Sequence, residues 1–243
     1  MQVIGIIPSR YASTRFPGKP LVMINGMTMI ERVYRQASKA SSLQKIIVAT
    51  DHDEIYKTVT AFGGNVVMTS ADHASGTDRC AEVLEKETGA WDAVINIQGD
   101  EPFIDPHQIE LLISCFNDET VEIATLVKKI SNSAELANPN TPKVILDNQS
   151  NAIYFSRQPI PYLKGGSIEK WQEAADYYKH IGIYGYRSKV LSELVKLPLG
   201  KLEKAESLEQ LRWLEGGFKI RTALTDIETI AIDTPEDLGS ISV

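Results

Sequence analysis

The chain contains little cysteine and no long apolar segment. Only two of its 243 residues are cysteines, Cys80 and Cys115, too few for a disulfide framework, so we expect two free thiols. No apolar run approaches the roughly 18 residues that a transmembrane helix needs. The start, Met1-Gln2-Val3, lacks the basic stretch that opens a signal peptide. We therefore expect a cytoplasmic protein that does not enter the membrane.

Positive charge is also scarce, and several common binding motifs are missing. Lys and Arg number 25 against 32 Asp and Glu, which gives a net charge of -7 and disfavours a nucleic-acid surface. Neither G-x-x-x-x-G-K-[ST] nor a G-x-G-x-x-G after the first expected strand occurs. His52, His73 and His107 have no partners at zinc-ligand spacing. Any local cluster of cations is thus expected to serve a small anion.

Apolar runs of strand length alternate with helix-like stretches in the first half of the chain. The expected strands are 3–7, 46–50, 65–68, 93–97 and 123–127, and the expected helices are 29–41, 53–62, 77–88 and 106–117. Asp105 before Pro106 has the pattern of an N-cap followed by proline at the first helical position. The alternation predicts an α/β fold, a Rossmann-like, mixed, mostly parallel sheet flanked by helices.

The pattern changes after Lys128. A hairpin is expected from 144–147 and 152–155, followed by strands at 180–186, 220–224 and 229–232 and a helix at 208–216. No internal repeat or low-complexity tract divides the chain. We expect a single domain over residues 1–243 that carries a smaller β-rich insert at about 130–200.

The loop after the first strand is rich in cations. Val3 to Ile7 has the composition of a strand buried on both faces, and Arg10, Arg15 and Lys19 follow it before Pro20. In an open α/β sheet, ligands bind at the carboxyl ends of the strands. Three cations with backbone N–H groups nearby suit a polyphosphate. A solvated basic surface loop is the alternative.

Two acidic residues are expected at the same edge of the sheet. Asp100 follows the strand at 93–97, and Asp233 follows the strand expected at 229–232. Carboxylates beside phosphate-binding cations make sense if a divalent metal lies between them, and Mg²⁺ prefers one or two carboxylates with phosphate oxygens. The alternatives are a turn residue for Asp100 and a helix N-cap for Asp233.

Two further strand-to-helix junctions carry polar residues. Ser75, Thr77 and Arg79 stand where a helix begins, and they would either face a base or ribose or, for the two hydroxyls, cap the helix. At the junction after the strand 46–50, we favour helix capping by Asp51 or Asp53.

The second half of the chain supplies candidates for an acceptor pocket. Arg157 suits a carboxylate-bearing acceptor, with His180 and Tyr184 beside it; a structural histidine is the alternative for His180. Glu206, Glu209 and Gln210 have the chemistry to bind sugar hydroxyls, and a solvated helix face is the alternative.

These motifs together resemble the family of 3-deoxy-manno-octulosonate (Kdo) cytidylyltransferases, or CMP-Kdo synthetases. The first loop alone would indicate only a sugar nucleotidyltransferase, and the later motifs make the resemblance specific. The matching stretches run nearly end to end and comprise 7–21, 49–51, 75–79, 96–102, 154–157, 180–186, 202–212 and 233–238.

The resemblance implies a nucleotide-diphospho-sugar transferase fold and a reaction of CTP with Kdo that yields CMP-Kdo and pyrophosphate for lipopolysaccharide synthesis. It implies Mg²⁺ as cofactor and a homodimer formed through the insert. Its nucleotide site would comprise Pro8, Arg10, Ser13, Arg15, Lys19, Ser75, Arg79 and Asp100. Its metal ligands would be Asp100 and Asp233. Its catalytic residues would be these two acids together with Arg10 and Lys19. Its contacts with Kdo would be Gln98, Arg157, His180, Tyr184, Glu209 and Gln210.

Two other functions remain open at this point. One is a nucleotidyltransferase for another acidic sugar, such as sialic acid, or for a sugar phosphate. The other is a non-catalytic nucleotide-binding regulator on the same fold, against which the presence of Asp100 and Asp233 together with Lys19 argues.

Overall fold

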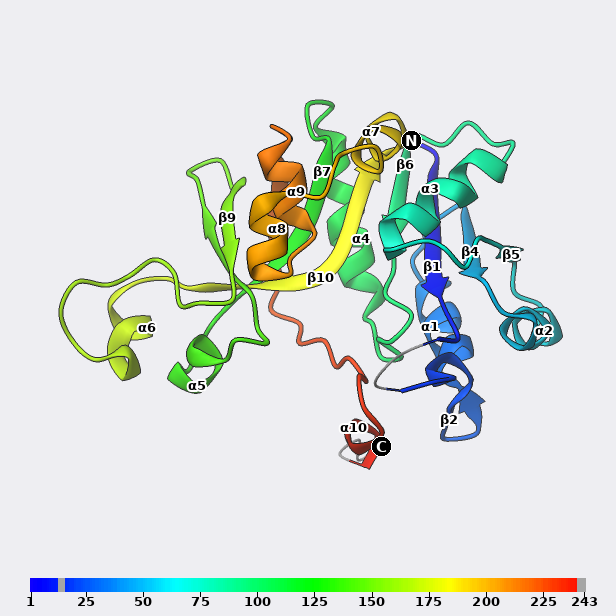
Figure 1. Ribbon diagram of the computed structural model, residues 1–243, viewed down its shortest axis with the longest axis horizontal. Helices are drawn as coiled ribbons and strands as arrows, with labels where there is room; N and C mark the ends of the chain where they lie inside the picture. The colour runs from blue at the N-terminus through cyan, green and yellow to red at the C-terminus, as the bar shows by residue number, and fades with distance from the viewer. Residues whose placement is uncertain (13–15, 240–243) are drawn as a thin grey trace. The chain divides into compact units, whose positions relative to one another are not determined.

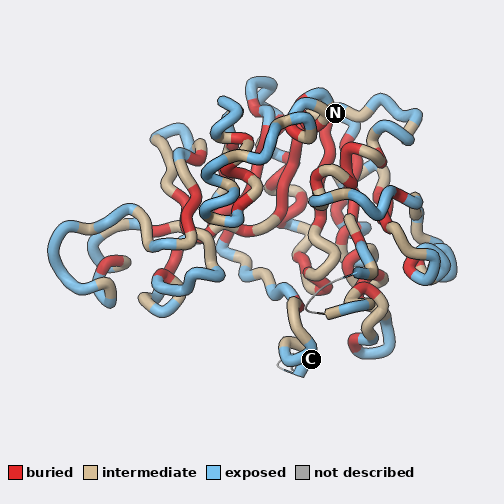
Figure 2. The backbone as a smooth tube through the Cα atoms, in the orientation of Figure 1, coloured by how far each residue is buried: buried red, intermediate tan, exposed pale blue. Residues whose placement is uncertain are grey.

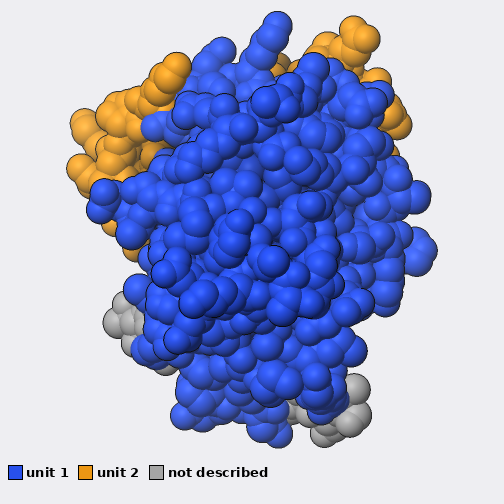
Figure 3. Space-filling view, turned by 90° about the vertical axis from the view of Figure 1, so that its right-hand side faces the viewer, with its two compact units in different colours: residues 1–113, 185–195, 229–243 blue, residues 114–184, 196–228 orange. Residues whose placement is uncertain are grey.

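The computed structural model describes residues 1–12 and 16–239, which form two compact units. Unit 1 comprises Met1–Ile113, Gly185–Val195 and Thr229–Val243, and unit 2 comprises Ser114–Tyr184 and Lys196–Glu228. Figure 3 colours unit 1 blue and unit 2 orange. The expected insert at about 130–200 falls largely within unit 2.

Unit 1 is built on parallel strands, which are β1 (Val3–Ser9), β4 (Lys45–Thr50), β5 (Val66–Met68) and β6 (Ala93–Asn96). Of these, β1, β4 and β6 are almost entirely buried, whereas β5 is not. β1 lies between β4 and β6, with Ile6 opposite Ile47 and Ile4 opposite Val94. Figure 2 shows these strands as buried runs. Strands covered on both faces need continuous apolar sequence, which explains why this part of the sheet was predictable.

The other elements of unit 1 are mostly helices. They are α1 (Met29–Ala37), α2 (Asp53–Ala61), α3 (Gly76–Lys86), α4 (Pro106–Ser114), α7 (Ser188–Leu194) and α10 (Pro235–Gly239), with the short elements η1 (Lys19–Leu21), β2 (Met23–Ile24) and β3 (Met27–Thr28). The N-cap side chains of Thr28 and Ser75 accept from backbone N–H groups of α1 and α3. The Asp105 carboxylate accepts from the His107 N–H at 2.8 Å, as predicted for the start of α4.

Unit 2 combines a parallel strand pair with antiparallel strands. Its elements are β7 (Ile123–Lys129), β8 (Lys143–Leu146), β9 (Ala152–Ser156), β11 (Ile220–Leu224), α5 (Ser133–Ala137), α6 (Trp171–Ala174), α8 (Lys201–Glu206), α9 (Gln210–Glu215), η2 (Cys115–Asn117) and η3 (Ile168–Lys170). β7 and β11 are parallel, whereas β8 pairs antiparallel with β9 and with β10 (Tyr178–Arg187). The expected hairpin is therefore present.

Within the described residues, nine strands form one mixed, mostly parallel sheet in the order β11-β7-β10-β6-β1-β4-β5, with β8 and β9 branching from β10 (Figure 1). The predicted α/β class is confirmed. Across the same described residues, no helix combines the length and apolarity needed to cross a bilayer.

One predicted strand is wrong. Residues 229–232 are not a strand, although their sequence alternates as one. Ile232 is fully buried and its N–H donates to the Asp100 carbonyl at 2.9 Å, whereas Ile230 is half exposed. The segment is fixed by this contact with a loop, and not by a strand ladder.

Candidate functional site

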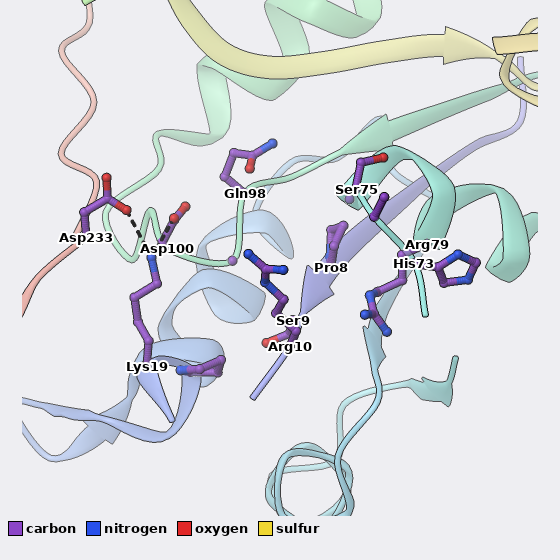
Figure 4. A pocket seen from close by; sticks show the side chains of 14 residues that line it. Pro8, Ser9, Arg10, Lys19, His73, Ser75, Arg79, Gln98, Asp100 and Asp233 are labelled. Atoms are coloured by element: carbon purple, nitrogen blue, oxygen red, sulfur yellow. Dashed lines mark hydrogen bonds and ion pairs between the residues drawn. The ribbon is translucent and has the colours of Figure 1, made fainter. Parts of the chain in front are cut away.

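A pocket of about 260 Å³ lies in unit 1 where β1 and β6 end. Because both strands are parallel, the loops that follow them meet at one edge of the sheet. The pocket is lined by eight of the residues predicted from the sequence: Pro8, Arg10, Lys19, Ser75, Arg79, Gln98, Asp100 and Asp233 (Figure 4). Ser13 and Arg15 lie outside the described residues.

Close backbone packing forms the bottom of this pocket. A Cβ atom on Gly99 would lie 2.7 Å from the Pro8 carbonyl oxygen, so glycine is needed for the β6 loop to approach the β1 loop this closely. The neighbours of Gly99 in the chain are Gln98 and Asp100, which both line the pocket. The close approach thus brings an amide and a carboxylate beside the cationic loop.

Lys19 bridges two carboxylates that lie 133 positions apart in the sequence. Its Nζ lies 2.8 Å from Asp100 Oδ2 and 3.3 Å from Asp233 Oδ1 (dashed in Figure 4). The Lys19 side chain is 14% exposed, and those of Asp100 and Asp233 are 29% and 41% exposed. The predicted meeting of Lys19 with both acids is therefore seen directly in the geometry.

Backbone contacts hold Asp233 at this position. The Ile232 N–H donates to the Asp100 carbonyl, and the N–H groups of Asp233 and Thr234 both donate to Asp237 Oδ2 at 2.8 Å. These donors hold the pKa of Asp237 below its usual range. Because α10 begins at Pro235, Asp233 lies one residue before the N-cap position, and its carboxylate reaches Lys19.

Glu101 is a buried acid that the sequence did not single out beyond its motif. It is 5% exposed. Burial, and then the charge of the neighbouring Asp100, raises the pKa of Glu101 to about 8, so this carboxyl is protonated at neutral pH. No sequence signal distinguishes it, because burial of one acid in an acidic loop is a tertiary effect.

Ser75 lies both at the pocket and at the start of a helix. Ser75 lines the pocket and is also the N-cap of α3, where its hydroxyl and the Asp78 carboxylate form a reciprocal capping box. Thr77 is buried within the first turn of α3. The capping alternative is thus confirmed for Ser75 and wrong for Thr77.

Arg79 lines the pocket, but its guanidinium is engaged by the protein. It is 3% exposed, one nitrogen lies 2.9 Å from Asp51 Oδ2, and another donates to the Thr69 hydroxyl. The predicted capping by Asp51 or Asp53 is wrong, because the imidazole of His52 caps α2 and leaves Asp51 to pair with Arg79.

Apart from Gln98, which lines the pocket of unit 1, the predicted acceptor residues belong to unit 2. Three of the five N–H groups of the Arg157 guanidinium donate to backbone carbonyls, those of Pro139, Glu206 and Ser207, at 2.7 to 3.2 Å. The Glu206 carboxylate accepts from the Ser156 hydroxyl and the Arg157 N–H, so Glu206 is not part of a solvated face.

His180 is held as a neutral imidazole. The Thr125 hydroxyl lies 2.7 Å from the Ile183 carbonyl and 3.1 Å from His180 Nε2. The shorter distance assigns the single hydroxyl proton to the carbonyl, and with this assignment Nε2 carries the hydrogen of the imidazole. Burial lowers the pKa of His180 to about 4. His180 therefore offers no positive charge at neutral pH.

The other acceptor candidates differ in their surroundings. The Tyr184 ring packs edge-on against Trp213, with centroids 4.9 Å apart. Glu209 lies 3.9 Å from the Arg212 guanidinium. Gln210 is 5% exposed, and its Nε2 has no hydrogen-bond partner among the described residues. A buried unpartnered amide is the kind of group that a polar ligand satisfies.

The donor set at Lys19 fits a hard divalent cation. The ammonium of Lys19 lies within ion-pair distance of the carboxylates of Asp100 and Asp233. These two acids therefore already hold one positive charge between them. Within residues 1–12 and 16–239, there is no group of three or more His, Cys, Asp or Glu residues that could hold a metal ion. The residues present therefore suit an ion such as Mg²⁺, which takes only one or two protein carboxylates.

Comparisons with known proteins point to one enzyme family. The cytidylyltransferase family profile matches residues 4–220. The 3-deoxy-manno-octulosonate cytidylyltransferase of Bacteroides thetaiotaomicron is 55% identical over 98% of this chain and 96% of its own length. That of Parabacteroides distasonis is 54% identical with the same coverage.

Solved structures extend the likeness to three dimensions. A CMP:2-keto-3-deoxy-manno-octonic acid synthetase complexed with CTP has a TM-score of 0.92 and 43% identity, over 99% of this chain and 96% of the other. A cytidylyltransferase from Leptospira borgpetersenii, 16% identical over 98% of this chain and 83% of the other, shares the fold with a TM-score of 0.63. From its sequence and its fold, the chain belongs to the 3-deoxy-manno-octulosonate cytidylyltransferase family.

Proposed function

We propose that this enzyme transfers CMP from CTP to the anomeric hydroxyl of Kdo and releases pyrophosphate. The observation that carries the proposal is the bridge from Lys19 to Asp100 and Asp233 at the carboxyl ends of parallel strands. Cations beside carboxylates at this edge suit a metal-bound triphosphate. Relatives at 54–55% identity are named for this reaction, and a similar structure was solved with CTP.

The pocket would hold the nucleotide from two sides. Arg10 and Lys19, with Ser13 and Arg15 of the same loop, would bind the triphosphate, and Pro8 would pack beside it. Ser75 and Arg79 would line the cytidine side, and Gln98 would contact the sugar acceptor. These assignments rest on the lining residues of the pocket and on the resemblance of the sequence motifs.

Asp100 and Asp233 would hold Mg²⁺. When bound, the ion neutralises phosphate charge and lowers the pKa of a nearby hydroxyl. The anomeric oxygen of Kdo would form a bond to the α-phosphorus of CTP in line with the bond to pyrophosphate, which would break, and the hydroxyl proton would pass to solvent water. Arg10 and Lys19 offset charge on the departing pyrophosphate, and such prearranged electrostatics is the main catalytic contribution in phosphoryl-type transfer.

The acceptor residues of unit 2 would bind Kdo. Among the described residues, three N–H groups of Arg157 bond to carbonyls, which leaves two donors for a carboxylate, and Gln210 offers a buried amide. Tyr184 and Glu209 would contact hydroxyl groups. His180 would act as a neutral hydrogen-bonding group, since its pKa is lowered to about 4.

A pyrophosphate-release assay tests the proposed function. With CTP, Kdo and Mg²⁺ we expect turnover, with much lower rates for ATP, GTP or UTP and for sialic acid as the acceptor. Turnover with sialic acid in place of Kdo would favour a related acidic-sugar enzyme. Tight CTP binding without release in the presence of Kdo and Mg²⁺ would favour a non-catalytic regulator.

We also propose that the product serves lipopolysaccharide synthesis, and that the enzyme is a cytoplasmic homodimer. The dimer would form through residues at about 130–200. Light scattering on the purified protein tests this, with a mass near twice the 26.9 kDa of the chain expected. A monomeric mass at micromolar concentration would contradict it.

A further inference from the structure

A buried ion pair lies behind the pocket, between the end of β4 and the start of α3. Arg79 and Asp51 are 2.9 Å apart, and their side chains are 3% and 12% exposed. The Arg79 guanidinium also donates to Thr69, whose own hydroxyl donates to the Thr50 carbonyl. Arg79 is thus fixed from two directions, and it fixes the orientation of the Asp51 carboxylate.

The second oxygen of Asp51 reaches the cationic loop. Asp51 Oδ1 accepts from the Tyr11 N–H at 3.3 Å, and the Tyr11 ring stacks on His52 with centroids 4.0 Å apart and an interplanar angle of 16°. Since Asp51 and His52 are consecutive, the backbone and the side chain of Tyr11 are both held by the same turn.

Tyr11 in turn holds the far end of this loop. Its carbonyl accepts from the Gly18 N–H at 3.0 Å, and Gly18 has a φ of 70°, a left-handed conformation that favours glycine. Lys19 follows directly and reaches the two carboxylates. An unbroken set of contacts therefore leads from Arg79 through Asp51, Tyr11 and Gly18 to Lys19.

We propose that Asp51 and Arg79 are positioning residues that hold the cationic loop in place for the triphosphate. A carboxylate shared by a buried guanidinium and a backbone N–H has one favoured orientation, and breaking one partner leaves the other charge buried without compensation. Asp51 then holds Tyr11, the Tyr11 carbonyl holds Gly18, and the direction of the Lys19 side chain depends on this series of contacts. The expected effect on CTP binding rests on the proposed function.

The chain offers a matched control for this pair. Lys45 Nζ lies 2.6 Å from Glu87 Oε2, which joins the beginning of β4 to the end of α3, the same two elements at their opposite ends. A variant at Glu87 perturbs the packing of α3 on β4 without touching the cationic loop. It therefore separates a positioning role of Asp51 from a purely structural one.

Two measurements test the proposal. The first is hydrogen–deuterium exchange of the segment 10–20 in the protein without ligands. We expect at least tenfold faster exchange in Asp51→Ala than in the wild type and a smaller increase in Asp51→Asn, whose amide oxygen still accepts from Tyr11. Glu87→Gln should leave this segment unchanged. Equal exchange in the wild type and both Asp51 variants would overturn the proposal.

The second measurement is CTP affinity by calorimetry in a double-mutant cycle. Asp51→Ala should weaken CTP binding at least tenfold in the wild-type background and much less in Lys19→Met, because the effect passes through Lys19. Equal losses in both backgrounds, or the same loss in Glu87→Gln, would overturn the proposal. If the wild type does not bind CTP, the proposed function fails, and the exchange measurement alone decides the role of Asp51.

Discussion

Replacing Lys19 by methionine should strengthen the binding of a free divalent cation while weakening the binding of CTP. The ammonium of Lys19 lies between Asp100 and Asp233, where a metal ion would have to compete with it. Methionine keeps most of the length of the side chain and removes its charge. The same substitution takes a cation away from the triphosphate, so the two affinities should move in opposite directions.

The size of the metal effect follows from the exposure of the two carboxylates. Unit charges about 4 Å apart interact by about 4 kcal/mol at an effective dielectric constant of about 20. The measured interaction energies of exposed ion pairs are only about 0.2–1 kcal/mol. Because Asp100 and Asp233 are 29% and 41% exposed, we take about 0.7 kcal/mol for each pair. Two pairs give about 1.4 kcal/mol, or about tenfold tighter metal binding.

Titration with Mn²⁺, followed by electron paramagnetic resonance without nucleotide, measures this affinity. Lys45→Met is the control, since it removes a lysine paired with a carboxylate in the same unit and outside the pocket. It should leave the Mn²⁺ affinity unchanged. Unchanged or weaker Mn²⁺ binding by Lys19→Met would refute the argument that Asp100 and Asp233 hold the metal in competition with Lys19.

Two further predictions concern stability. Lys143 is fully buried and donates to three backbone carbonyls at 2.6 to 2.8 Å. Lys143→Met should therefore lower the free energy of unfolding by about 2 kcal/mol, which is measured as a lower urea midpoint. The exposed Lys204→Met should change the urea midpoint little. The pKa of His180 is about 4 when folded against its usual 6.5, so on acidification the unfolded chain takes up the proton first. Up to about 3 kcal/mol of stability present above pH 6.5 should be lost as the pH falls towards 4, and His180→Phe should flatten this dependence in urea titrations. Parallel pH profiles of the two proteins, or equal midpoints for the two lysine variants, would contradict these expectations.

The sequence predicted the parts of the fold in which local pattern and burial agree. β1, β4 and β6 are buried on both faces and appear as continuous apolar runs. Residues 229–232 have an alternation of side chains that is typical of a strand, yet their backbone bonds to a loop. The alternation of side chains does not show whether a partner strand is available. The short helix α8 was not predicted, since Lys201–Glu206 has no buried face to produce a periodic pattern.

The site was predictable where it lies on strand ends and unpredictable where charges pair at long range. That Lys19 and Asp100 lie at one edge follows from the parallel order of β1 and β6. Asp233 reaches Lys19 from a segment that is not a strand and that bonds to the Asp100 carbonyl through Ile232. The pairing of Arg79 with Asp51 was not predicted, because helix capping accounted for Asp51 and a base or ribose contact accounted for Arg79, each within its own segment. The burial of Glu101 likewise depends on the packing around its loop.

The most direct test of the account is pyrophosphate release from CTP and Kdo by Asp100→Asn and Asp233→Asn. Both changes keep the side-chain shape and remove a charge, so the circular dichroism spectra should match that of the wild type. Asp176→Asn, at an exposed ion pair with Lys129, serves as control. We expect the two pocket variants to lose at least about a hundredfold in turnover and the control to keep it. Near-normal release by both pocket variants would contradict the assignment of this site.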